Sequence, residues 1–120
     1  MSKLEINSVR DKGKLETECL WLHAAEDIPN LGEYVVCDST YGGDGRISNE
    51  LRHTYWLPRI AVKKGDWVQL VTKTGQNNLT KNDKNTTTHT FFWNLGHTVW
   101  NKGGDAAVVF KIESMTHKRV

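Results

Sequence analysis

Two stretches of the chain alternate between apolar and polar positions with a period of two. The first covers residues 4–9, with the sequence LEINSV, and the second covers residues 68–73, with the sequence VQLVTK. A period of two places every second side chain on the same face of an extended strand. Both stretches are therefore predicted to be β-strands with one face turned toward a core.

Short apolar runs, rich in Val, Ile, Thr and aromatic residues, predict further strands. They cover residues 15–25, 32–38, 51–57, 67–73, 90–94, 98–100 and 106–113. Clusters of Gly, Pro, Asn and Asp separate these runs and predict turns at residues 13, 28–32, 41–45, 64–66 and 101–105. Many short strands separated by turns are typical of an all-β sandwich or barrel.

Residues 15–26, with the sequence LETECLWLHAAE, also fit a helix. Leu15, Cys19, Leu22 and Glu26 recur at near-helical spacing, and Leu, Glu and Ala favour helices. Periodicity alone leaves strand and helix open here. Residues 75–88 contain a single apolar residue, Leu79, and predict a long polar loop. Such a loop is either functional or mobile, and the mobile interpretation is favoured.

Three segments of the sequence match motifs of one known family. Residues 53–70, HTYWLPRIAVKKGDWVQL, resemble the aromatic-x-x-Pro strand end, Gly-centred turn and apolar strand of the lamin-tail domain. Residues 98–109, TVWNKGGDAAVV, resemble its Trp-Asn-x-x-Gly-Asp turn, and residues 28–36, IPNLGEYVV, are similar to its Leu-Gly-x-aromatic step. The resemblance implies one domain over residues 1–120 with an immunoglobulin-like antiparallel β-sandwich of roughly seven to nine strands. It also favours a strand over residues 15–25.

The resemblance has limits that restrict its functional meaning. The sequence holds no coiled-coil rod, no basic localisation cluster and no C-terminal CaaX box. Filament assembly and attachment to the lamina therefore do not follow. The resemblance implies only the fold and a general binding or structural role.

Composition and charge exclude several classes of protein. The chain has 120 residues, of which 38% are hydrophobic and 25% charged, as is usual for a globular domain. Its net charge of +2, from 16 basic and 14 acidic residues, is far from the basic balance of dedicated nucleic-acid binders. The sequence shows neither a signal peptide nor an apolar run of about 18 residues, so we expect a cytoplasmic protein.

No arrangement of residues predicts an enzyme. The five histidines, at positions 23, 53, 89, 97 and 117, lack metal-ligand spacing, and there is no GxSxG motif, phosphate-binding loop or CxxC pair. Glu16 and Glu18 lie two residues apart, where they could pair for acid–base chemistry, but an exposed sheet face is the favoured interpretation. We therefore expect no catalytic residue, no metal and no cofactor.

The two cysteines flank the turn at residues 27–32. If the flanking segments form a hairpin, Cys19 and Cys37 would lie opposite each other. A disulfide is unusual in a reducing compartment, so two buried free thiols are the favoured interpretation.

Aromatic and basic residues supply the candidate binding surface. Five tryptophans are too many for the core of one sandwich to hold easily. The resemblance implies that Trp67 and Trp100 lie in or near the core, and we expect Trp56 and Trp93 to be partly exposed. In a strand, Phe91 and Trp93 share one face, and burial of that face against a second sheet is favoured over exposure. The candidate partner-binding residues are Trp56, Phe91, Trp93, Lys63, Lys64 and Lys102.

The sequence thus predicts a non-enzymatic binding or structural adaptor module. A protein partner is expected to contact a sheet edge or an aromatic patch. The alternative is a weak nucleic-acid-binding domain, which would use the lysine-bearing loops and exposed tryptophans.

Overall fold

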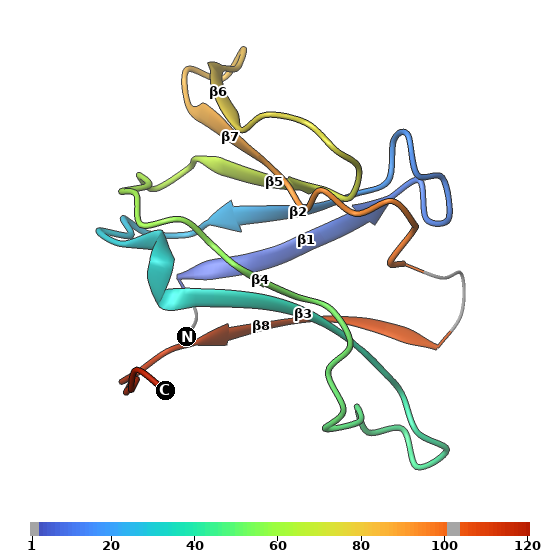
Figure 1. Ribbon diagram of the computed structural model, residues 1–120. Helices are drawn as coiled ribbons and strands as arrows, with labels where there is room; N and C mark the ends of the chain where they lie inside the picture. Colours follow the sequence, from blue (N-terminus) through green and yellow to red (C-terminus); the bar gives the residue numbers. More distant parts are fainter. Residues whose placement is uncertain (1–2, 101–103) are drawn as a thin grey trace.

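The protein is a sandwich of two β-sheets (Figure 1), as seen in a computed structural model that describes residues 3–100 and 104–120. The larger sheet has the strand order β1-β2-β5-β7-β6, and its members are β1 (Leu4–Arg10), β2 (Cys19–Ala24), β5 (Trp67–Val71), β7 (Thr87–Phe92) and β6 (Asn78–Lys81). The smaller sheet has the order β4-β3-β8, and its members are β4 (Thr54–Trp56), β3 (Tyr34–Thr40) and β8 (Asp105–Lys111). A 3-10 helix, η1 (Leu31–Glu33), precedes β3. The predicted all-β sandwich is confirmed.

Strand pairing is antiparallel with one exception. β5 and β7 run parallel, with Val68 beside His89 and Leu70 beside Phe91. Parallel neighbours need a crossover connection, and here the chain makes it through β6, which pairs with the far side of β7. The larger sheet is therefore mixed rather than purely antiparallel.

The core fills the space between the sheets. Leu20, Leu22, Val68 and Leu70 project into it from the larger sheet and are fully buried. Val36 faces them from β3, with other buried residues at the ends of the sandwich. The predicted burial of Trp100 is confirmed at 2% exposure, but Trp67 lies half-buried on the outer face of β5.

The ambiguous segment at residues 15–26 contains a strand rather than a helix. Residues 14–18 make one tight turn, in which the N–H of Glu18 donates to the carbonyl of Lys14, and β2 starts at Cys19. The expectation that Glu16 and Glu18 share an exposed sheet face is wrong, because Glu18 is fully buried. The strand predicted at residues 98–100 is not formed, and this segment has no regular secondary structure.

The polar stretch at residues 75–88 is ordered, contrary to expectation. It forms β6, a tight turn and the start of β7, so it is a β-hairpin at the edge of the larger sheet. The Oδ1 atom of Asn82 accepts hydrogen bonds from the N–H groups of Lys84 and Thr86 and from the Thr86 hydroxyl. All four residues of β6 are exposed, so this strand gives no hydrophobic signal in the sequence.

The cysteines do not face each other. Cys19 lies on β2 in the larger sheet and Cys37 on β3 in the smaller one, so the hairpin alternative is wrong. Both are buried free thiols. Burial raises the pKa of the Cys37 thiol, and the nearby carboxylate of Asp38 adds to this increase against a hydrogen bond with Thr54.

Candidate functional site

The outer face of the smaller sheet carries a row of apolar side chains across its three strands. Val35 on β3 pairs with Trp56 on β4 on one side and with Phe110 on β8 on the other. Directly paired residues project from the same face of a sheet. Trp56 and Phe110 are 47% and 46% exposed, so they flank the half-buried Val35 at the surface. We call Trp56, Val35, Phe110 and the neighbouring Val108 the apolar face.

No charged side chain projects outward from the paired positions of this sheet. The residues on this side of the sheet are Val35, Cys37, Ser39, Thr54, Trp56, Ala106, Val108 and Phe110, of which Cys37, Ser39 and Ala106 are buried. In an antiparallel sheet with one solvated face, outward positions are normally polar. This departure marks the apolar face as a candidate contact surface.

The Trp56 ring is held in place by its surroundings. Its Nε1–H donates to the carbonyl oxygen of Gly32 at 2.6 Å, and the guanidinium of Arg59 lies 5.9 Å from the ring centroid. A Cβ atom at residue 32 would approach the Cγ of Arg59 to 2.7 Å, so a side chain there would displace Arg59. A fixed aromatic ring loses little conformational entropy when it is covered by a partner.

The structure separates the residues predicted to form one binding surface. Phe91 and Trp93 are buried at 4% and 9% exposure, in contact with the ring of Tyr55. Lys63 and Lys64 are exposed in the turn that leads into β5 of the larger sheet, whereas Trp56 lies on the smaller one. Lys102 lies outside the described residues. Of the predicted set, only Trp56 contributes to the apolar face.

A second surface, which the sequence analysis missed, lies on the outer face of the larger sheet. Trp21 on β2 and Trp67 on β5 meet there edge to face, with ring centroids 6.0 Å apart and an angle of 87° between the planes. They line an open hollow of about 290 Å³, and the remaining lining residues are Asn7, Arg10, Asn82, Asp83, Lys84 and Thr88. Trp21 alternates with the core residues Leu20 and Leu22 in β2, and Trp67 directly precedes the core residue Val68 in β5. The period of two therefore places both indole rings on the face opposite the core.

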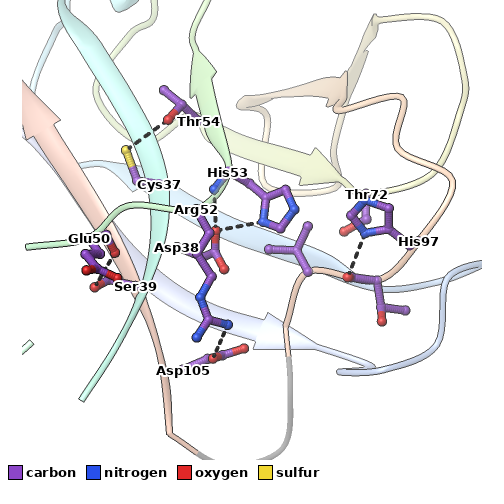
Figure 2. A network of polar contacts seen from close by, with 12 residues as sticks. Cys37, Asp38, Ser39, Glu50, Arg52, His53, Thr54, Thr72, His97 and Asp105 are labelled. Atoms are coloured by element: carbon purple, nitrogen blue, oxygen red, sulfur yellow. Dashed lines mark hydrogen bonds and ion pairs between the residues drawn. The ribbon is translucent and has the colours of Figure 1, made fainter. Parts of the chain in front are cut away.

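A buried carboxylate–histidine pair connects β3 to the segment before β4 (Figure 2). The Oδ1 atom of Asp38 accepts a hydrogen bond from the N–H of His53 and lies 2.9 Å from its Nδ1. Asp38 is 1% exposed, and its Oδ2 has no partner among the described residues. The His53 ring also packs against that of His97, with centroids 5.2 Å apart. A carboxylate at Nδ1 orients the imidazole, as in a general base.

The groups that nucleophilic catalysis would need are engaged elsewhere. The hydroxyl of Ser39 donates to the carbonyl of Ser48 at 2.7 Å, and the thiol of Cys37 faces the hydroxyl of Thr54 at 3.8 Å (Figure 2). Within residues 3–100 and 104–120, no three His, Cys, Asp or Glu side chains gather as metal ligands would. The pair of Asp38 and His53 thus joins two segments of the smaller sheet.

A second carboxylate–histidine pair ties β5 to β7. The Nε2 atom of His89 lies 3.1 Å from Oδ2 of Asp66, whose two oxygens also accept the N–H groups of Thr87 and Lys63. Burial by itself would raise the pKa of the Asp66 carboxyl, but these hydrogen bonds and the His89 ring outweigh it and lower the pKa. This pair fixes the parallel register of the two strands.

Comparisons with family models, with curated proteins and with solved structures found no match. In the part of the chain that the structure describes, no helix is long and apolar enough to cross a membrane.

Proposed function

We propose that the protein is a non-enzymatic binding module that docks a protein partner on its apolar face. The observation that carries this proposal is the exposed row of Trp56, Val35 and Phe110, on a sheet face without outward charges. Aromatic residues at the centre of an uncharged patch are the usual energetic anchors of protein interfaces. The resemblance to the lamin-tail domain belongs to the same proposal, since it implies a sandwich and a binding role.

The chemistry of this face favours protein over nucleic acid. A nucleic-acid partner needs cations beside its stacking rings to neutralise phosphates. Arg59 is the one cation found beside the ring of Trp56 among the described residues. Trp93, the other predicted stacking residue, is buried. An apolar protein surface is the better complement.

The reducing compartment expected from the sequence also belongs to this proposal. Cys19 and Cys37 are both buried and unpaired. Free buried thiols are usual in proteins kept in a reducing environment. We accordingly propose a cytoplasmic location.

Site-specific photo-crosslinking in cells that make the protein tests the docking proposal. A benzophenone amino acid replaces Phe110 on the apolar face or, as the matched control, Thr80 on the exposed strand β6. We expect discrete protein adducts from position 110, and we expect Trp56→Glu to remove them while the far-UV circular dichroism stays unchanged. Equal adduct patterns from positions 110 and 80, or adducts that survive Trp56→Glu, would refute the proposal.

A further inference from the structure

The hollow on the outer face of the larger sheet has the properties of a ligand site, and it lies apart from the apolar face. A second open hollow of about 400 Å³, lined by Glu5, Ile6, Asn7, His23 and Trp67, adjoins it. The two hollows share Asn7 and Trp67, so they adjoin at these residues and together form one continuous surface. Their volumes are near the lower end of the range for small-molecule sites, about 300 to 1,000 Å³.

The two tryptophans form a corner. Because their planes meet at 87°, a flat ligand ring cannot stack on both indoles at once. One indole can offer its face as a platform while the other limits the ligand at its side. The His23 ring packs against Trp67 with centroids 4.5 Å apart and supports it from β2. Neither indole N–H makes a hydrogen bond within residues 3–100 and 104–120, so both are available as donors.

The turn between β6 and β7 supplies polar groups at the rim. Asn82 is occupied in holding this turn, with Oδ1 accepting from Lys84 N at 3.0 Å and its amide donating to Thr88. The side chains of Asp83 and Lys84 extend from the turn, and within the described residues no ion pair engages them. The turn is thus fixed by one residue and presents its two neighbours to the hollow.

The charges around the hollows balance. Arg10 and Lys84 are cationic, and Glu5 and Asp83 are anionic. A chain of phosphates would meet two carboxylates here and gain little from two cations. Hydroxyl groups both donate and accept, so they can bond to side chains of either sign. The axial C–H groups of a sugar ring also match the negative face of an indole.

We infer that this surface binds a neutral oligosaccharide, with one sugar ring against the corner of Trp21 and Trp67. Neighbouring sugars extend toward Glu5 and His23 in the second hollow, and ring hydroxyls bond to Arg10 and Asp83. This inference is independent of the docking proposal, because the two surfaces lie on opposite outer faces of the sandwich.

Nuclear magnetic resonance of the indole N–H groups tests the inference. The full chain is titrated with hexasaccharides of β-1,4-linked glucose, mannose, xylose and N-acetylglucosamine and of α-1,4-linked glucose, and the five indole signals are assigned by single Trp→Phe variants. We expect at least one hexasaccharide to shift the signals of Trp21 and Trp67 saturably, with a Kd below about 1 mM. The signal of Trp56 should not move.

Three variants locate the site. Trp67→Ala should weaken binding by about tenfold or more, since stacked aromatic rings dominate such contacts. Asp83→Ala, on an exposed turn, should weaken it by about fivefold and keeps the test valid if Trp67→Ala does not fold. Trp56→Ala, the control on the other sheet, should leave the affinity unchanged.

Two outcomes would overturn the inference. One is the absence of any shift at Trp21 and Trp67 with every hexasaccharide at about 10 mM. The other is a shift of these signals by oligothymidylate alone, with an affinity that falls steeply as salt is added, which would assign the surface to single-stranded nucleic acid.

Discussion

The carboxylate of Glu18 accepts a hydrogen bond from the hydroxyl of Thr72 at 2.7 Å, and this bond joins the start of β2 to the end of β5. The same Oε2 atom accepts the N–H of Val99 at 2.9 Å, and Oε1 accepts the N–H of Gly13 at 2.9 Å. Glu18 is fully buried, so three segments that are distant in sequence depend on one side chain. Such a carboxylate organises the end of the sandwich from which Trp100 enters the core.

Glu18→Ala is expected to lower the free energy of unfolding by about 3 to 5 kcal/mol. The substitution leaves the buried donors of Thr72 and Val99 without an acceptor, at about 1 to 3 kcal/mol each, whereas the N–H of the exposed Gly13 can bond to water instead. Chemical denaturation followed by tryptophan fluorescence measures the change. The matched control is Glu16→Ala two residues away, whose side chain is 85% exposed and meets Lys73 at 3.7 Å, and which should cost less than about 1 kcal/mol. Equal effects of the two substitutions would contradict this role for Glu18.

Trp100→Ala is expected to destabilise the protein by about 3 to 5 kcal/mol, because the ring is 2% exposed and packs against Trp93 with centroids 6.2 Å apart. Thermal and chemical unfolding would both report the loss. Trp56→Ala serves as the comparison, since this ring is 47% exposed and makes one hydrogen bond. A cost for Trp100→Ala no larger than that for Trp56→Ala would show that the ring does not support the core.

The alternation of apolar and polar residues predicts the strands whose inner faces are buried. It does not predict strands without buried residues, and it misassigns faces where a strand is irregular. In β5, Val68 and Leu70 face the core as the period of two predicts. In β1, a bulge between Ile6 and Ser8 reverses the faces, so that Val9 pairs with Leu20 and packs against the core. The extra residue explains why the apolar Val9 occupies a position that the alternation from Leu4 and Ile6 assigns to the polar face.

The candidate surfaces were harder to predict than the fold. The sequence predicts Trp56 as a candidate binding residue because it is a large aromatic ring in a short predicted strand. The apolar face also needs Val35 and Phe110, which come from strands far apart in sequence and meet only through pairing. The resemblance to the lamin-tail domain implies a core position for Trp67, but this residue alternates with the core residue Val68 in β5 and therefore faces outward.

The hairpin of β6 and β7 determines what a deletion of residues 77–85 would cost. A mobile loop at residues 77–85 would be removable at little cost in loop-closure entropy. The structure instead gives these residues a strand that covers the edge of β7, so deleting them is expected to destabilise the protein.

Asn82→Ala should by itself lower the free energy of unfolding by about 1 to 2 kcal/mol, because Oδ1 accepts three hydrogen bonds in the turn between β6 and β7. Lys84→Ala is the control, and a similar cost for both would contradict the role of Asn82.

The lowered pKa of Asp66 predicts acid sensitivity with a defined sign. The carboxyl binds a proton less readily in the folded protein than in the unfolded chain, whose value is near the ordinary 3.8. The unfolded state therefore takes up protons first as the pH falls, so the contribution of Asp66 to stability is complete above about pH 5 and is lost progressively below it. Protonation would weaken its bonds to Thr87 N and to the ring of His89.

Melting temperatures measured from pH 6 to pH 2.5 test this prediction. They should fall steeply below about pH 4 for the wild type and less steeply for Asp66→Asn. The control Asp83→Asn, on an exposed turn, should retain the wild-type slope. An Asp66→Asn profile parallel to that of the wild type would mean that other carboxylates set the acid limit, and that the bonds joining β5 to β7 do not depend on this charge.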